Sequence, residues 1–323
     1  MEPQGGFHGA GLLMTDRLVP FVAGPTAVGK SAVAMELARR TGGEIVSADS
    51  RQVYRELTVA TAKPGAEDRR QVPHHLVDAR SVREPISSGE YARVAEAAIS
   101  DIVSRGRQPI VVGGSTLHLQ AMVFGLADIP PVEPSIRIAL QARMISEGLE
   151  TMHRRLVEVD PAYAVTLDGS KSQRILRGLE VFEGTGRPLS SFFESGSSPA
   201  FEYEVFVLTR ERTELYRRID ERVESMVAGG LVEEARGLAA DGFDLEANPG
   251  RTIGYHEAAA SLRGEVDLAE MVRRIQVDTR RYAKRQLTWL RRFPSFRWLD
   301  LSVMTTEEAV DRILGTRQGQ ALG

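Results

Sequence analysis

The sequence predicts an α/β protein, in which a parallel sheet carries helices on both faces and an all-helical insertion interrupts the chain. Strand and helix signals alternate over the first ~125 residues, as in a parallel sheet. The predicted strands are short apolar runs of the kind buried between two layers of helices. No strand pattern occurs between residues 128 and 200, which predicts the insertion. The expected elements of the first part are strands at 18–23, 44–48 and 109–112 and helices at 31–40 and 88–105.

The first strand runs directly into a glycine-rich loop. Residues Gly24–Ser31 read GPTAVGKS and match G-x-x-x-x-G-K-[ST], with an apolar strand before them and a helix after them. In this context, the loop amides and the helix N-terminus bind phosphate. Lys30 is placed to reach terminal phosphate oxygens, and the Ser31 hydroxyl is placed to ligate Mg²⁺. The fold class is therefore predicted to be P-loop NTPase-like, with a diphosphate or triphosphate ligand.

Two more strands end in polar residues at the same edge of the predicted sheet. Asp49 follows the second strand, and Gly113-Gly114-Ser115 follows the third. Asp49 could be a turn residue, a Mg²⁺ ligand or a general base that acts on a substrate amine or hydroxyl. The glycine pair either ends the strand or lets a substrate approach closely, with Ser115 as a hydrogen-bonding group. No acidic residue ends the strand at 109–112, which argues against ATP hydrolysis.

The insertion begins and ends at recognisable breaks. Three prolines within residues 130–134 mark a linker, and helical periods follow at 149–159 and 175–182. A strand at 201–208 then rejoins the sheet, and a helix follows it. On that helix, Arg218 and Arg222 lie one turn apart and could hold phosphate oxygens or form an exposed surface pair with neighbouring glutamates.

A long helix is predicted over residues 267–292. One stripe is apolar apart from Thr279, Tyr282 and Gln286, and the opposite line carries cations. Residues 273–297 contain nine Arg or Lys and one acidic residue, Asp278. Such a face is either an ordinary solvated surface or a binding site for a polyanion.

The composition excludes several classes of protein. The chain has 323 residues, a net charge of −3 and no cysteine, which rules out disulfides and thiol chemistry. It has no apolar run long enough to cross a membrane and no leader-like N-terminus. We therefore expect a cytoplasmic enzyme, a flexible N-terminal extension over residues 1–16 and no membrane association.

Several motifs together resemble the tRNA dimethylallyltransferases of bacterial type. They are GPTAVGKS (24–31), ADSRQVYREL (48–57), TAKP (61–64), VPHHLVD (72–78), PIVVGGS (109–115), QRILRGLEVFEGTGRPLS (173–190), YRRIDERVESM (216–226), IGYHE (253–257) and AKRQLTWLRR (283–292). The phosphate loop alone is common to many kinases, whereas the combination is specific. One departure is His118, which stands where the family usually has a tyrosine.

The resemblance implies a reaction and the residues that perform it. A dimethylallyl group would pass from dimethylallyl diphosphate to N6 of the adenine 3′ to the anticodon, and diphosphate would leave. Asp49, Ser115 and Arg218 would be catalytic, with Asp49 as the base, and Mg²⁺ would bind Ser31. The diphosphate would be held by Gly24, Thr26, Ala27, Val28, Gly29, Lys30 and Ser31.

The resemblance also implies a tRNA-binding surface and a domain plan. The implied tRNA contacts are Asp49, Ser50, Arg51, Gln52, Ser115, Arg137, Gln173, Arg174, Arg177, Arg251, Gly254, Tyr255, His256, Arg280, Lys284, Arg285, Gln286, Trp289 and Arg291. Residues 17–127 and 201–323 would form the catalytic core of a monomer, and 128–200 would bind the anticodon stem-loop. Two alternatives remain: an adenine-nucleotide isopentenyltransferase and an ATP-dependent small-molecule kinase.

Overall fold

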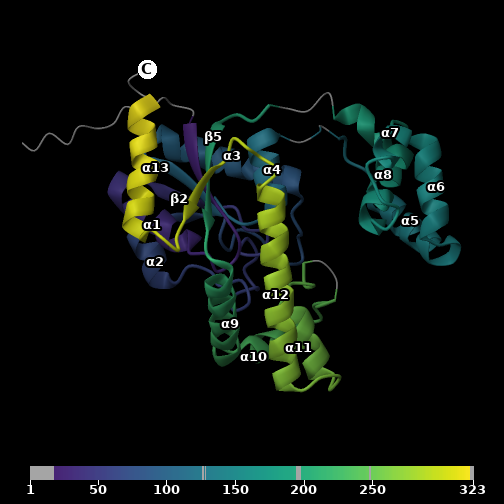
Figure 1. The fold of residues 1–323 in the computed structure, drawn as a ribbon. Coiled ribbons are helices and arrows are strands. Elements are labelled where there is room, and N and C mark those ends of the chain that lie inside the picture. Colours follow the sequence, from purple (N-terminus) through teal and green to yellow (C-terminus); the bar gives the residue numbers. More distant parts are fainter. Residues whose placement is uncertain (1–17, 126, 128, 194–197, 247–248, 321–323) are drawn as a thin grey trace, which may run out of the picture. The chain divides into compact units, whose positions relative to one another are not determined.

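The computed structural model describes residues 18–125, 127, 129–193, 198–246 and 249–320. The predicted extension over residues 1–16 lies outside this range. The chain divides into two compact units (Figure 1): one runs to Val123 and resumes at Ala200, and the other is Phe124–Pro199. The binding of an anticodon stem-loop by the second unit stays a prediction.

In the described part of the chain, the first unit contains a six-stranded parallel sheet with the order β3-β2-β4-β1-β5-β6. The strands are β1 (Leu18–Ala23), β2 (Glu44–Ser47), β3 (His74–His75), β4 (Pro109–Gly113), β5 (Glu202–Thr209) and β6 (Arg297–Asp300). The four predicted strands are confirmed to within a residue. The two at the sheet edges, β3 and β6, were not predicted, because neither is an apolar run.

Helices cover both faces of this sheet, as predicted (Figure 1). Those of the first unit are α1 (Lys30–Thr41), α2 (Ala66–Gln71), α3 (Ser88–Ser104), α4 (Thr116–Phe124), α9 (Arg212–Ala228), α10 (Leu231–Ala240), α11 (Tyr255–Leu262), α12 (Leu268–Leu290) and α13 (Thr306–Gln320). The sequence did not predict α2, α4, α10, α11 or α13.

The strands alternate their side chains between two cores. In β1, Val22 packs with α1, α9 and α13, whereas Phe21 and Ala23 pack with α3 and α4. This period of two is the reason that wholly apolar strands are stable only between two layers of helices. A third core joins the segment after β2 to α10, α11 and the first half of α12. It supports the carboxyl edge of the sheet, where the phosphate loop begins.

All the regular elements in the described residues of the second unit are helices. Its elements are α5 (Pro134–Glu147), α6 (Leu149–Val159), α7 (Pro161–Ala164), α8 (Ser172–Thr185) and a 3₁₀ helix, η1 (Leu189–Phe192). The helices share their own core around Leu140, Leu156 and Ile175. A separate core of this kind confirms the predicted helical insertion.

Candidate functional site

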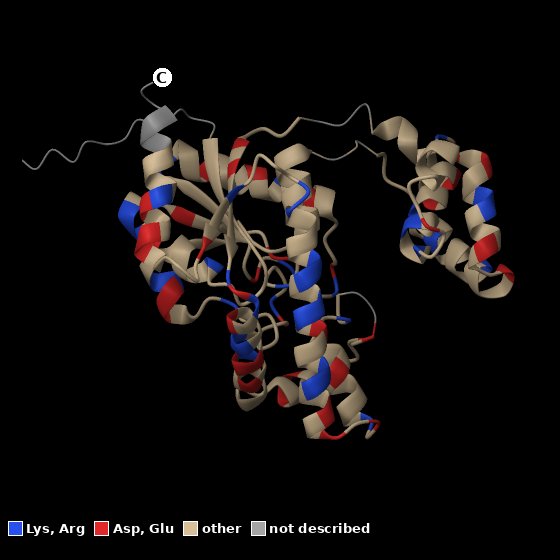
Figure 2. Ribbon diagram, viewed as in Figure 1, with Lys and Arg blue, Asp and Glu red and all other residues tan. Residues whose placement is uncertain are grey.

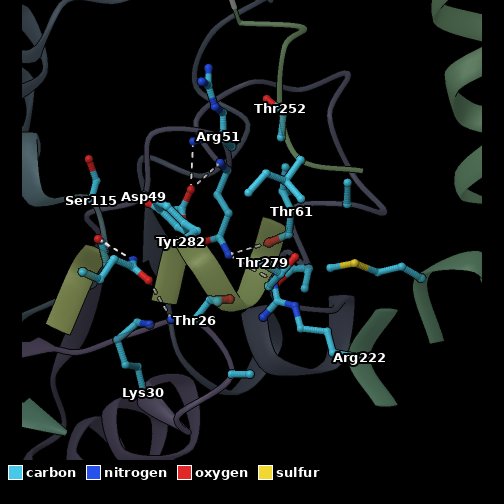
Figure 3. Close-up of a pocket in the computed structure, with 18 of the residues that line it drawn as sticks. Thr26, Lys30, Asp49, Arg51, Thr61, Ser115, Arg222, Thr252, Thr279 and Tyr282 are labelled. Carbon is cyan, nitrogen blue, oxygen red and sulfur yellow. Dashed lines mark hydrogen bonds between the residues drawn. The ribbon is translucent and has the colours of Figure 1, made fainter. Parts of the chain in front are cut away.

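Three turns at the carboxyl edge of the sheet open onto one cavity of about 850 Å³ (Figure 3). The phosphate loop after β1, the turn after β2 and the turn after β4 all contribute lining residues. So do α9 and α12. The cavity therefore contains Asp49, Lys30, Ser115 and Arg218, which the sequence had separated by up to 188 residues (30 to 218).

The phosphate loop is tightly curved around its own lysine. Gly29 has φ 114° and stands just before α1, and Ala27 also adopts a left-handed conformation, with φ 62°. Lys30 Nζ donates hydrogen bonds to the carbonyls of Gly24 at 3.1 Å and Pro25 at 2.7 Å. Burial lowers the pKa of Lys30 to about 8, although the charge of Asp49 opposes this shift; Arg222 adds to it. A bound anion would stabilise the charged ammonium and raise this pKa again.

Two arginines, Arg210 after β5 and Arg218 on α9, hydrogen-bond to the same loop. Arg218 Nε donates to the Ala27 carbonyl at 2.9 Å, and Arg210 Nε donates to the Val28 carbonyl at 2.9 Å. Arg218 was predicted to lie beside the loop, and it does. Arg210 was missed, because it directly follows a strand and carries no motif of its own. Together they supply positive charge next to the loop.

Asp49 follows β2 at the carboxyl edge of the sheet, as predicted. Its Oδ1 accepts hydrogen bonds from the backbone N–H of Arg51 at 2.8 Å and of Gln52 at 3.3 Å. The carboxylate is therefore a turn residue and a cavity-lining group at once. The side chain of Gln52 accepts from Ser47 and donates to the carbonyls of Thr61 and Ala62, so it fastens the loop that forms one cavity wall.

The turn after β4 brings Ser115 to Asp49. A Cβ on Gly113 would lie 2.0 Å from the Ala48 carbonyl oxygen, so only glycine fits there. The close approach lets the Ala48 amide donate to the Val112 carbonyl at 2.6 Å. Ser115 is mostly buried, and its Oγ accepts from the His118 amide at 3.4 Å, which leaves the hydroxyl hydrogen available to a ligand.

The inner face of α12 and one arginine of α9 complete the cavity. Thr279, Tyr282 and Gln286 line it from α12, and Arg222 lines it from α9. Burial and the nearby Asp49 raise the pKa of Tyr282 to about 12, so its hydroxyl stays protonated. Thr279 and Tyr282 were not predicted as site residues. Polar residues that interrupt an otherwise apolar stripe are the signal that could have identified them.

Three predicted tRNA contacts, Gly254, Tyr255 and Gln286, lie inside the protein. Tyr255 and Gln286 are buried and use their polar atoms inside the protein: Tyr255 Oη donates to Glu234 at 2.6 Å, and Gln286 bonds to two backbone groups. Gly254 is also buried, and its amide donates to Glu257. These residues therefore lie beneath the outer surface, and of the three only Gln286 lines the cavity. A motif match cannot distinguish a residue that contacts RNA from one that supports its neighbours.

The cationic line on α12 is partly neutralised. Figure 2 shows acidic positions among the basic ones along this helix. Arg273 pairs with Glu270, and Arg280 pairs with Asp220 of α9. Within the described residues, Lys284 and Arg291 are exposed and have no carboxylate partner. Among the described residues, ion pairs thus neutralise two of the four cations on this line, which are Arg273, Arg280, Lys284 and Arg291.

The remaining predicted contacts lie in several places. Ser50, Arg51, Arg251 and Arg285 line the cavity, His256 pairs with Glu246, and Trp289 packs on Phe293 with ring centroids 4.7 Å apart. In the second unit, Arg137 and Arg177 both pair with Glu180, and Arg137 also donates to Gln173, while Arg174 is exposed.

The described residues contain no cluster of three or more His, Asp or Glu side chains that could hold a metal ion. Ser31 is exposed at the start of α1 and lines the cavity. A single hydroxyl beside a diphosphate site fits Mg²⁺, which usually keeps several waters and takes most other ligands from substrate phosphates. None of the described helices is long and apolar enough to cross a membrane.

Comparisons with known proteins agree on one family. The model described as IPP transferase matches residues 52–293. The tRNA dimethylallyltransferase of Salinibacter ruber is 46% identical over 291 residues, which is 90% of both chains. That of Anaeromyxobacter dehalogenans is 48% identical over 286 residues, covering 88% of this chain and 94% of the relative.

Solved structures agree with the sequence matches. The tRNA isopentenylpyrophosphate transferase of Bacillus halodurans superimposes with a TM-score of 0.69 at 35% identity and covers 95% of this chain and 98% of its own. A eukaryotic dimethylallyltransferase acting on tRNA has a TM-score of 0.76 at 28% identity and covers 89% and 74%.

Proposed function

Because this chain belongs to the tRNA dimethylallyltransferase family, we propose that it transfers a dimethylallyl group from dimethylallyl diphosphate to tRNA. The acceptor is N6 of the adenine at position 37, 3′ to the anticodon, in tRNAs that read codons beginning with U. The products are N6-isopentenyladenosine and diphosphate. The observation that carries the proposal is that the phosphate loop, Asp49 and Ser115 line a single cavity.

The phosphate loop would bind the leaving group. As the allylic C–O bond breaks, negative charge grows on the diphosphate, and fixed N–H donors and cations stabilise that charge. Lys30 and Arg218 lie at the loop and would supply this positive charge. Bound through Ser31, Mg²⁺ would add positive charge beside the departing diphosphate. The loop residues Gly24 and Thr26–Ser31 thus serve a prenyl donor, and no phosphoryl group is transferred.

Asp49 would take the proton from the acceptor. The adenine N6 is a poor nucleophile because its lone pair is delocalised into the ring. As the new C–N bond forms, one N6 proton passes to the carboxylate, and the electron pair of the C–O bond leaves with the diphosphate. Ser115, with a free hydroxyl hydrogen, would orient the adenine or the diphosphate at the same edge.

The acceptor base must leave the anticodon-loop stack to enter the cavity, as base-modifying enzymes require. Its tRNA would be held by phosphate contacts from exposed cations such as Lys284 and Arg291, and by the helical unit through Arg137, Gln173, Arg174 and Arg177. We further propose that the enzyme acts as a monomer in the cytoplasm, where its tRNA substrates occur.

Transfer to a free adenine nucleotide uses the same cavity chemistry and is the second candidate. The helical unit of Phe124–Pro199 favours RNA over a free nucleotide, since a small acceptor does not require a second folded unit. A kinase is less consistent with β4, which ends in Gly113 and carries no acidic residue for Mg²⁺.

The test is incubation with radiolabelled dimethylallyl diphosphate and Mg²⁺ in three parallel reactions, with unmodified tRNA, the same tRNA carrying guanine at position 37, or AMP. Label in the first reaction alone is expected. Label in AMP but not tRNA would favour the nucleotide enzyme. No label in any reaction would contradict prenyl transfer altogether.

A further inference from the structure

Gln286 is a buried polar residue on the inner face of α12. Its side chain is only 3% exposed, although it lies between the exposed residues Lys284 and Arg285 and the exposed Thr288. The neighbouring inward positions are apolar: Ala283 packs in one core of the sheet and Leu290 in the other. A carboxamide in such surroundings is costly unless both its donor and its acceptor are used.

Both ends of the carboxamide are used, and they join two parts of the site. The Thr26 amide donates to Gln286 Oε1 at 3.0 Å, and Gln286 Nε2 donates to the Gly114 carbonyl at 2.7 Å. The two partners identify which atom of the carboxamide is the oxygen, because the Thr26 N–H needs an acceptor and the Gly114 carbonyl needs a donor. A carboxamide satisfies both at once, because it carries a donor and an acceptor on one planar group and needs no particular pH to do so.

The two partners of Gln286 lie in parts of the site with different proposed roles. Thr26 is in the loop proposed to bind the donor diphosphate, and Gly114 immediately precedes Ser115 on the acceptor side of the cavity. The contact is close, because a Cβ on Gly114 would lie 2.5 Å from Gln286 Nε2 and 3.1 Å from the Gly24 carbonyl oxygen. Three segments, the phosphate loop, the end of β4 and α12, therefore meet at this glycine.

We propose that Gln286 is a positioning residue that sets the spacing between the diphosphate loop and the Ser115 turn. It acts through its hydrogen bonds to Thr26 and Gly114, and this role rests on the proposed function. Loss of the bridge would let the two turns move independently. The donor would then be bound less tightly and held less accurately, whereas the outer face of α12 would be unchanged.

The main test compares Gln286→Met with wild type and with Lys284→Ala, a matched change on the exposed side of the same helix. Methionine keeps the length of the side chain and removes both hydrogen bonds. We expect Gln286→Met to raise the KM for dimethylallyl diphosphate about tenfold and to lower kcat, with the Kd for tRNA within about twofold. Lys284→Ala should show the reverse, a weaker Kd for tRNA and an unchanged KM for the donor.

A second variant keeps the inference testable if Gln286→Met does not fold. In Gln286→Glu, one oxygen still accepts from the Thr26 amide, but the other faces the Gly114 carbonyl and can donate only when protonated. Burial and that carbonyl raise the pKa of the introduced carboxyl. The ratio of variant to wild-type kcat/KM for the donor should therefore rise as the pH falls from 8 to 6, and a purely structural defect would leave the ratio constant.

The outcomes separate this inference from the proposed function. Wild-type enzyme that labels no tRNA would contradict the proposed function. With an active wild type, an unchanged donor KM in Gln286→Met, or a constant pH ratio in Gln286→Glu, would overturn the positioning role. A weakened Kd for tRNA with an unchanged donor KM would instead make Gln286 an RNA contact.

Discussion

The His118 imidazole stacks on the Tyr91 ring, with centroids 3.6 Å apart and an interplanar angle of 8°. Tyr91 in turn donates a hydrogen bond to the carbonyl of Ser47, the last residue of β2. The stack therefore lies next to the end of β2, the strand that leads to Asp49, and His118 is not among the residues that line the cavity. The departure from the family at residue 118 thus lies next to the residues that support the site, Tyr91 and Ser115.

His118 should make stability depend on pH. Burial lowers its pKa to about 4, and within the described residues its Nδ1 has no hydrogen-bond partner. The unfolded chain binds the proton near pH 6.5, so the folded state loses stability as the pH falls from about 6.5 towards 4. His118→Phe keeps the stacked ring and removes the titration. We expect urea unfolding to show that wild type loses about 2 kcal/mol more than the variant between pH 7 and 4.5. An equal loss of unfolding free energy in wild type and variant would show that protonation of the His118 ring does not destabilise the folded state.

The donor affinity should depend on the protonation of Lys30. The ammonium form binds the diphosphate, and the pKa of about 8 in the free enzyme means that this form disappears above pH 8. We expect the KM for dimethylallyl diphosphate to be constant below pH 7 and to rise up to about tenfold by pH 9. Lys30→Arg is the control, because a guanidinium stays charged over this range and should flatten the curve. A rise of equal size in the arginine variant would place the titrating group elsewhere.

Asp49 has two roles that can be separated by substitution. Asp49→Asn keeps an oxygen that accepts from the Arg51 and Gln52 amides but cannot take a proton, whereas Asp49→Ala loses both functions. If the carboxylate is the base, both variants should lose about 10²- to 10⁴-fold in kcat and keep a Kd for tRNA within a few fold of wild type. Single-turnover rates and filter binding measure the two quantities. An active asparagine variant would assign Asp49 to the turn alone.

The unpaired cations on α12 should dominate its contribution to RNA binding. Lys284→Ala should weaken tRNA binding and reduce the slope of log Kd against log salt by about 0.7 to 0.9, the value of one phosphate contact. Arg273→Ala is the matched control on the same line of the helix, since Arg273 is already paired with Glu270. It should change the slope less. Equal effects of the two substitutions would mean that ion pairing within α12 does not decide which cations bind RNA.

Local sequence was sufficient for the elements that carry their own pattern. The apolar run Leu18–Ala23 followed by GPTAVGKS could only be a buried strand entering a phosphate loop. The ends of β2 and β4 placed Asp49 and Ser115 at the same edge, because parallel strands share their direction. Short edge strands such as His74–His75 gave no local signal, since they are defined by their pairing with β2.

The sequence by itself determined the α/β class, the phosphate loop, the four central strands and the family. Those features depend on side-chain period and turn chemistry, which act over a few residues. Only the tertiary structure decided that Arg210 fastens the loop, that Arg280 is paired with Asp220 and that Gln286 faces Thr26 and Gly114. Each of these contacts joins residues 60 to 260 positions apart. No local pattern encodes such a contact, because it exists only after segments that are distant in the sequence have packed together.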